Sequence, residues 1–98
     1  MYARLTTTPI SPYRLDEAIG IARDITLPAA RQQPGFKGYL MLVDRSAGVA
    51  MTITFWQDED DRQVSGPESA YYKDSIAKLV PLLTGAPVVQ DFEVAVQA

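Results

Sequence analysis

The sequence predicts an α+β fold: a ferredoxin-like βαββαβ two-layer sandwich. Four short stretches alternate between two faces as strands do, and two stretches have apolar residues at helical spacing. Each helical stretch lies between two strands, so right-handed crossovers give a four-stranded antiparallel sheet with both helices on one face. With 98 residues, we expect a single domain over residues 1–98.

The first strand and the first helix are expected in the first third of the chain. Residues 2–8 are rich in β-branched side chains and predict a strand. Ser11 can cap a helix that has Pro12 at its first position. The apolar residues that follow have helical spacing: Leu15, Ala18, Ile19, Ala22 and Ile25. Pro28 should bend or interrupt this helix, and residues 33–35 should end it.

Residues 36–43 and 47–56 predict the two middle strands, with the chemistry of a hairpin loop over residues 44–48. Alternation puts only one of Phe55 and Trp56 toward the helices and leaves open which one. We expect these alternate positions on the uncovered sheet face: Tyr39, Met41, Val43, Ala50, Thr52 and Trp56. They are too apolar for a wholly solvated surface, so we predict a homodimer through the exposed sheet face.

The second helical segment is expected to have two parts. Asp58 and the three acids after it are typical of a helix N-terminus. Ser65 and Glu68 have capping-box spacing and should restart the helix. An apolar stripe at helical spacing follows: Tyr72, Ile76, Leu79, Val80 and Leu83. Pro81 should kink the last turn, and residues 88–97 predict the final strand.

The composition excludes several classes of function. The chain has no Cys and no His, which removes disulfides, thiolate nucleophiles, most zinc sites and the usual haem ligand. Its net charge is −3 and its arginines are scattered, which argues against nucleic-acid binding. No apolar run approaches membrane-spanning length, so we expect a cytoplasmic protein that does not bind membranes.

Several motifs together resemble a known family. Gln33 with Pro34, Gly35 and Phe36, then Gly48, then a strand that ends in Trp56 before an acidic helix start, are similar to the antibiotic biosynthesis monooxygenase group of the dimeric α/β-barrel superfamily. The closing residues 87–94 resemble its last strand. The resemblance implies a ferredoxin-like homodimer with a pocket between sheet and helices. It also implies oxidation of electron-rich aromatic substrates without metal or flavin, so no cofactor is expected.

The resemblance also implies candidate site residues. Trp56 matches the family's tryptophan, Thr52 stands where an asparagine is common, and the family's helix histidine has no counterpart. Trp56 could stack on a planar ligand or only end a strand. Tyr72 and Tyr39 are further candidates for substrate binding, with a place in the core or the dimer contact as their alternatives.

Charged residues offer weaker candidates. Arg62 could orient a phenolate, although a helix partner such as Glu59 is the simpler interpretation. The catalytic candidates are therefore Trp56, Tyr72 and Arg62. The acids at 58–61 point around a helix and predict no metal site. Asp91 and Glu93 share a strand face, where ion pairing is the alternative to acid–base chemistry.

Two functions remain after the sequence analysis. The first is a small cofactor-independent monooxygenase that acts on a planar aromatic or phenolic substrate. The second is a non-catalytic dimeric module for small-molecule binding or assembly. Tyr71, next to Tyr72, is expected to be exposed or interfacial. An enzyme requires Thr52, Trp56 and Tyr72 to converge on one cavity, whereas an assembly unit has them spread over a filled core and an interface.

Overall fold

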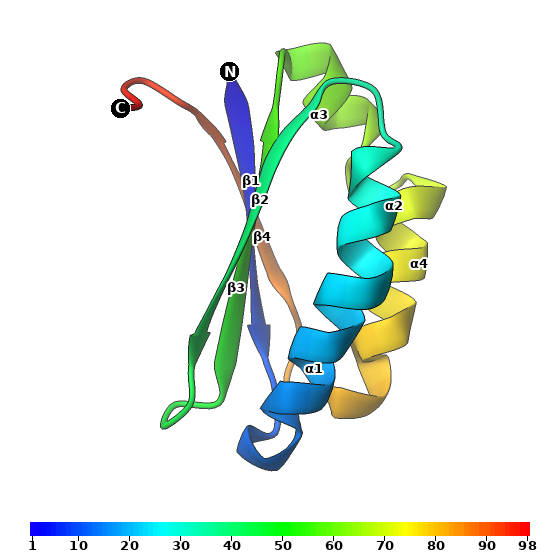
Figure 1. Ribbon diagram of the computed structural model, residues 1–98, viewed down its shortest axis with the longest axis vertical. Coiled ribbons are helices and arrows are strands. Elements are labelled where there is room, and N and C mark those ends of the chain that lie inside the picture. Colours follow the sequence, from blue (N-terminus) through cyan, green and yellow to red (C-terminus); the bar gives the residue numbers. More distant parts are fainter.

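Two layers form the molecule in the computed structural model, which describes residues 1–98: a sheet and a layer of helices on one of its faces (Figure 1). The strands are β1 (Tyr2–Pro9), β2 (Phe36–Asp44), β3 (Val49–Trp56) and β4 (Val88–Glu93). The α-helices are α1 (Leu15–Ile21), α2 (Leu27–Arg31), α3 (Glu59–Val64) and α4 (Ala70–Leu79). Three short helical turns complete the chain: η1 (Pro12–Arg14), η2 (Ala22–Thr26) and η3 (Val80–Leu82). The predicted ferredoxin-like order of elements is confirmed.

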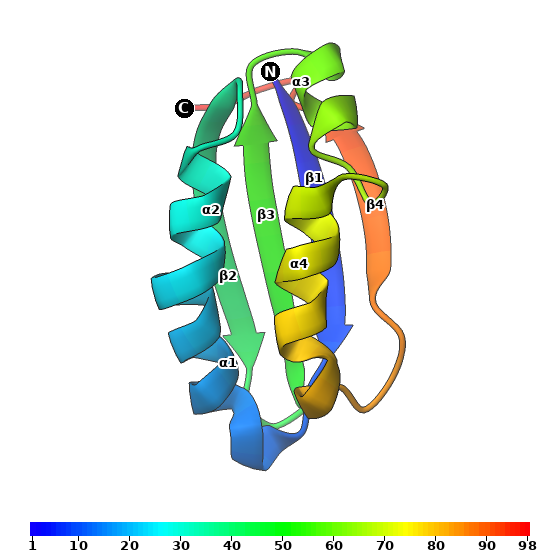
Figure 2. The ribbon, with the colours of Figure 1, turned by 90° about the vertical axis from the view of Figure 1, so that its right-hand side faces the viewer.

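The sheet has four strands in the order β2-β3-β1-β4, and all its pairings are antiparallel. The first strand is central and pairs Thr6 with Thr52 of β3 on one side and with Val89 of β4 on the other. The two helical segments lie side by side across one face of this sheet (Figure 2). This arrangement leaves the opposite face without cover in the monomer.

The first helical segment is continuous through Pro28, although its hydrogen-bond register changes before the proline. Residues Ala22–Thr26 form a π-helical turn, and the helix resumes as α2. A proline lacks an N–H and its ring crowds the carbonyl four residues earlier, so a wider turn relieves the conflict without ending the helix. The predicted bend at Pro28 is therefore a π turn. Ser11, the expected cap, makes no side-chain capping hydrogen bond.

The hairpin between β2 and β3 has the predicted loop. Asp44 Oδ1 accepts hydrogen bonds from Ser46 Oγ and from the N–H of Ala47, both at 3.0 Å. Gly48 then adopts a φ of 68°, in the left-handed region that favours glycine. An added Cβ there would lie 2.8 Å from the carbonyl oxygen of Ile10, so close packing also requires glycine.

The second helical segment is capped at two places, of which one was predicted. Asp58 Oδ1 accepts from the N–H of Asp61 at 2.9 Å and begins α3, as expected. The prediction that Ser65 caps the second part is wrong, since Ser69 accepts from the N–H of Tyr72 and begins α4. Ser65 is buried, and its hydroxyl donates to the carbonyl of Asp61. The final strand is shorter than predicted and ends at Glu93.

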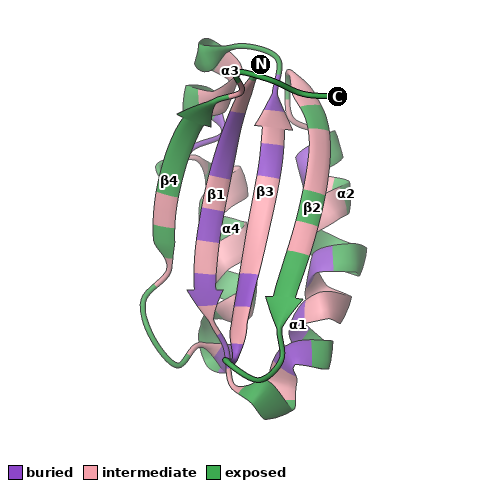
Figure 3. Cartoon of the chain, turned by 90° about the vertical axis from the view of Figure 1, so that its left-hand side faces the viewer, coloured by how far each residue is buried: buried purple, intermediate pink, exposed green.

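The sheet faces are the reverse of the expected assignment. Residues expected on the uncovered face lie under the helices instead, and this set includes Tyr39, Met41, Ala50, Thr52 and Trp56. Strand pairing then puts the alternate set on the open face: Leu5, Leu40, Leu42, Met51, Ile53, Phe55, Val88 and Phe92. Figure 3 views this open face. It is still apolar, so the reason for expecting a partner there is unchanged.

The hydrophobic core occupies one end of the space between the layers. Its buried residues are Ile10, Leu15, Ala18, Ala50 and Leu82, with Ile21, Met41, Leu79 and Leu83 packed against them. The remaining space between the layers is lined by apolar side chains and by threonine, serine and tyrosine side chains.

Candidate functional site

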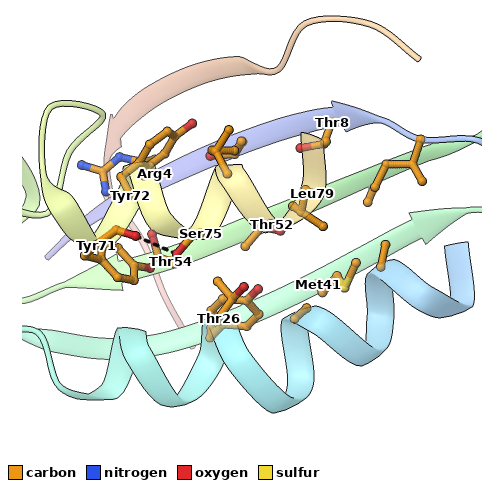
Figure 4. Close-up of a pocket in the computed structure, with 17 residues that line it drawn as sticks. Arg4, Thr8, Thr26, Met41, Thr52, Thr54, Tyr71, Tyr72, Ser75 and Leu79 are labelled. Carbon is orange, nitrogen blue, oxygen red and sulfur yellow. Dashed lines mark hydrogen bonds between the residues drawn. The ribbon is translucent and has the colours of Figure 1, made fainter. Parts of the chain in front are cut away.

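A cavity lies between the sheet and the helices, next to the core (Figure 4). The strands contribute Arg4, Thr6, Thr8, Tyr39, Met41, Ala50, Thr52 and Thr54, and Ile10 follows β1. The helices contribute Ala18, Ala22, Thr26, Tyr71, Tyr72, Ser75, Ile76 and Leu79. The cavity volume is about 60 Å³. Its lining combines an apolar end near the core with a ring of hydroxyls and one guanidinium.

Two hydroxyls of the cavity wall make hydrogen bonds within the protein. Ser75 Oγ donates to the carbonyl oxygen of Tyr71 at 2.8 Å. Thr54 Oγ1 accepts a 2.9 Å hydrogen bond from Trp56 Nε1. These two bonds fix part of the wall before any ligand enters, and preorganisation of this kind favours binding.

The cavity tyrosines are neutral at physiological pH. Burial raises the pKa of Tyr71 to about 12, and the neighbouring Tyr39 adds to this shift. Burial also raises the pKa of Tyr39 and of Tyr72, although the nearby hydroxyls of Thr52 and Thr6 oppose this shift. A phenol with a raised pKa donates hydrogen bonds and is a poor base near neutral pH. The site is therefore rich in donors and holds no carboxylate in its wall.

Arg4 is the only fully charged group in the cavity wall, and its side chain is 3% exposed. Nη1 donates to the carbonyl oxygen of Ser65 at 2.9 Å, and Nη2 donates to the carbonyl oxygen of Arg62. Nε lies 3.5 Å from Asp91 Oδ1. Burial lowers the pKa of Arg4, and the carboxylate of Asp91 opposes this shift. The guanidinium thus fixes the end of α3 to the middle of the sheet.

Trp56 lies behind the cavity wall. Its side chain is fully buried, and its ring makes edge contacts with Phe36 at 6.0 Å and with Tyr71 at 6.3 Å between centroids. The Arg4 guanidinium carbon lies 5.9 Å from the indole centroid. Trp56 is absent from the residues that line the cavity, but three of its neighbours (Arg4, Thr54 and Tyr71) line it. It therefore shapes the wall from behind.

The other predicted residues divide into two groups. Thr52, Tyr72 and Tyr39 line the cavity together. Arg62 does not line it, since its Nη1 lies 2.8 Å from Asp91 Oδ2 and its Nη2 lies 3.6 Å from Glu59 Oε1. Asp91 is thus an ion-pair partner within the chain. No group of three or more acidic side chains is placed to hold a metal ion.

A shallower groove adjoins the cavity on the helix side. It lies between α2 and α4, and its lining includes Ile25, Gln32, Gln33, Asp74 and Lys78. Tyr71 and Ser75 line both the groove and the cavity. The two hollows therefore meet at these side chains.

Among the cavity residues that sequence reasoning missed are Tyr71, Arg4 and Thr26. Tyr71 was expected to be exposed or interfacial, whereas it lines the cavity and packs against Trp56. Arg4 and Thr26 were not considered. Arg4 shares a strand face with Thr6 and Thr8, so a polar face on a central strand was a usable signal. No such signal marks Thr26 in the sequence, because this residue lies in a π turn that was not predicted.

Sequence comparisons find uncharacterized relatives. No protein-family model matches the chain. It is 28% identical over 95 residues to the uncharacterized proteins Rv2557 and Rv2558 of Mycobacterium tuberculosis, and the match covers 97% of the chain. It covers only 41% and 39% of these two proteins. The chain thus spans about two fifths of the length of the curated relatives it matches.

Solved structures match nearly the whole fold. A monooxygenase from the gene ActVA-Orf6 of Streptomyces coelicolor, in complex with the ligand nanaomycin D, has a TM-score of 0.75 at 19% identity and covers 99% of this chain and 91% of its own. A structure named antibiotic biosynthesis monooxygenase has a TM-score of 0.75 at 17% identity, with coverages of 97% and 99%. Rv0793 from Mycobacterium tuberculosis has a TM-score of 0.72 at 15% identity, with coverages of 99% and 97%. The predicted resemblance is confirmed at the level of structure: this chain has the fold of the antibiotic biosynthesis monooxygenases.

Proposed function

We propose that this chain is a cofactor-independent monooxygenase that acts on a planar aromatic or phenolic substrate. The observation that carries the proposal is the donor-rich cavity, in which Tyr39, Thr52 and Tyr72 surround one space between the sheet and the helices. The Streptomyces protein with this fold is named a monooxygenase and binds nanaomycin D. A fold hosts many functions, so the cavity carries more weight than the shared architecture.

The donors suggest how the cavity would assist the reaction. Loss of a proton from an anthrone-like substrate leaves negative charge on its oxygen, and preorganised hydroxyls stabilise such charge. Tyr39 and Tyr72 are buried neutral phenols that suit this role. The resulting carbanion transfers electrons to dioxygen, so that one oxygen atom enters the ring as a carbonyl and the other leaves as water. Because the wall has no carboxylate, the substrate's own acidity must supply the proton loss.

The size of the cavity sets a condition on substrate entry. A volume of about 60 Å³ is below the ~150 Å³ of an engineered cavity that takes up benzene. An aromatic ring must therefore displace side chains as it enters. The meeting point of the cavity and the groove, at Tyr71 and Ser75, is the proposed mouth.

We also propose that the protein is a homodimer, with a second copy on the open sheet face. Leu40 and Leu42 are each 50% exposed there, and Phe92 is 49% exposed. Monomers rarely leave so large an apolar patch in water. A second copy is the natural occupant, since an isologous contact pairs this apolar face with itself and requires no other protein.

Oxygen uptake tests the activity directly. The assay compares the wild type with Trp56→Phe, Tyr39→Phe and Thr52→Val on hydroquinones and anthrone-like phenols. We expect uptake above the uncatalysed rate, and a fall of about tenfold when Tyr39 or Thr52 loses its hydroxyl. Thr84→Val is the control, because Thr84 is exposed and outside the cavity. No uptake above background over a broad panel would refute the monooxygenase.

A second candidate is a binding module without catalysis. The absence of a carboxylate or histidine from the cavity wall favours it, because no side chain there is a ready general base. The two candidates differ in one measurement. A binding module takes up the phenolic ligand with the same hydroxyl dependence and consumes no oxygen.

A further inference from the structure

One fully buried hydroxyl in the cavity wall has no hydrogen-bond partner. Among the buried side-chain nitrogen and oxygen atoms, only Arg4 Nε and Thr26 Oγ1 lack a hydrogen bond. Arg4 Nε still has Asp91 at 3.5 Å, so its charge is compensated. Thr26 is 9% exposed and has no such neighbour. A buried hydroxyl without a partner destabilises the protein, so its presence in a cavity wall requires an explanation.

The unpartnered Thr26 lies at the end of the π turn. A threonine in an α-helix usually donates to the carbonyl four residues earlier, which here belongs to Ala22. In this helix the Ala22 carbonyl accepts the N–H of Leu27, a bond that spans five residues. Thr26 Oγ1 makes no hydrogen bond to that carbonyl or to any other group. Single π turns occur frequently at functional sites.

Thr26 extends from the helix layer toward the sheet, where Thr52 lies in the opposite wall (Figure 4). Tyr39 of β2 lines the same cavity. Thr52 and Tyr39 both carry hydroxyl groups. The cavity thus has hydroxyl groups on its sheet side and the buried, unpartnered hydroxyl of Thr26 on its helix side. A ligand placed between the layers meets hydrogen-bonding groups at both of its edges.

We infer that Thr26 is a specificity-determining residue that binds an oxygen substituent on the helix-side edge of the ligand. The ligand is then an aromatic compound oxygenated at two opposite edges, of the hydroquinone or dihydroxyarene class. This inference deepens the proposed function and rests on the same cavity. It concerns recognition alone, so it is testable by binding without turnover.

The test uses two ligands of one shape: 2,6-dihydroxynaphthalene and 6-methyl-2-naphthol, which differ by a hydroxyl against a methyl group. Equilibrium dialysis measures both against wild type, Thr26→Val and Thr26→Ser, with Thr84→Val as control. We expect the wild type to prefer the diol by about threefold to tenfold, the range of one hydrogen bond. Thr26→Val should abolish this preference and leave the methyl compound within about twofold, and Thr26→Ser should retain the preference.

Thermal unfolding of the unliganded variants gives an independent check. Valine has nearly the shape of threonine, so Thr26→Val should unfold at the same or a higher temperature than wild type. A marked fall would mean that the hydroxyl is already satisfied, and it would overturn the inference. Equal binding of the two compounds by wild type, or no binding of either, would also overturn it. Selective binding of the diol without oxygen uptake would support the inference while refuting the monooxygenase.

Discussion

Arg4 Nη1 donates a 2.9 Å hydrogen bond to the carbonyl oxygen of Ser65, a residue 61 positions later in the chain. This contact joins the central strand to the connection between α3 and α4. Asp91 Oδ1 lies 3.5 Å from Arg4 Nε and balances part of its charge, and the Tyr72 ring lies 5.9 Å from the guanidinium carbon. Arg4 therefore supports both the α3 end and the tyrosine side of the cavity.

The first prediction concerns this guanidinium. Arg4→Met should lower the free energy of unfolding by about 2–4 kcal/mol, because two buried carbonyls and Asp91 lose a charged partner. Arg4→Lys should restore only part of this loss, since an ammonium lacks the planar set of donors. Urea denaturation measures both. Arg31→Met, at an exposed position, should stay within about 0.5 kcal/mol of wild type. Equal losses at the two positions would contradict the structural role of Arg4.

The second prediction concerns alkaline pH. The pKa of Tyr71 is about 12 in the folded protein, against an ordinary value of 10.0. Between these values the unfolded chain loses the proton and the folded protein keeps it. The stabilisation from Tyr71 is therefore complete below pH 10 and is lost as the pH rises toward about 12. Tyr71→Phe should make the free energy of unfolding fall less steeply over this range.

Urea denaturation at several alkaline pH values measures that slope. Tyr13→Phe is the matched control, because Tyr13 is 98% exposed and contacts no part of the cavity. An unchanged slope in Tyr71→Phe would show that the phenol is not held neutral by burial.

The third prediction concerns the open sheet face. Light scattering coupled to gel filtration should give the wild type twice the chain mass of 10.8 kDa. Leu40→Asp or Leu42→Asp should give monomers, since a charge at the centre of an apolar contact is not compensated. Val80→Asp, at a residue that is 55% exposed on the helix side, should remain dimeric. A monomeric wild type would exclude this interface.

The fourth prediction compares two glycines. Gly48→Ala should lower the free energy of unfolding by about 1–3 kcal/mol, because φ is 68° and the new Cβ would meet the Ile10 carbonyl oxygen at 2.8 Å. Gly20→Ala should raise it by about 0.5–1 kcal/mol, since Gly20 lies in α1 and the nearest atom is 3.8 Å away. Thermal melting of both variants decides the signs. A stabilised Gly48→Ala would contradict the packing of the hairpin loop.

Local chemistry in the sequence was sufficient to predict most of the fold. Asp58 begins α3, and the loop between Asp44 and Gly48 closes the hairpin, because each depends on residues within a few positions. Local chemistry did not predict which face of the sheet the helices cover. Alternation groups residues into two sets but does not say which set the helices cover. Hydrophobicity misled here, because the covered face contributes many threonine and tyrosine side chains to the cavity wall, whereas the open face is apolar.

The candidate site was predicted only in part, because the surroundings of a side chain depend on tertiary packing. Thr52, Tyr72 and Tyr39 do share one cavity. Trp56 was a candidate because it is the only tryptophan in the chain. Its surroundings, however, depend on Phe36 and Tyr71, which tertiary packing brings next to it. Thr26, whose hydroxyl has no partner, lies in a π turn that no sequence pattern predicted.

The position of Trp56 gives the protein an optical label of its own. It is the sole indole in the chain, it is shielded from water, and its N–H is bound to Thr54 in the cavity wall. Its fluorescence therefore comes from one defined place. A compound that enters the cavity and moves Tyr71 or Thr54 changes the surroundings of this single emitter, so ligands of the protein can be screened by light without any added dye.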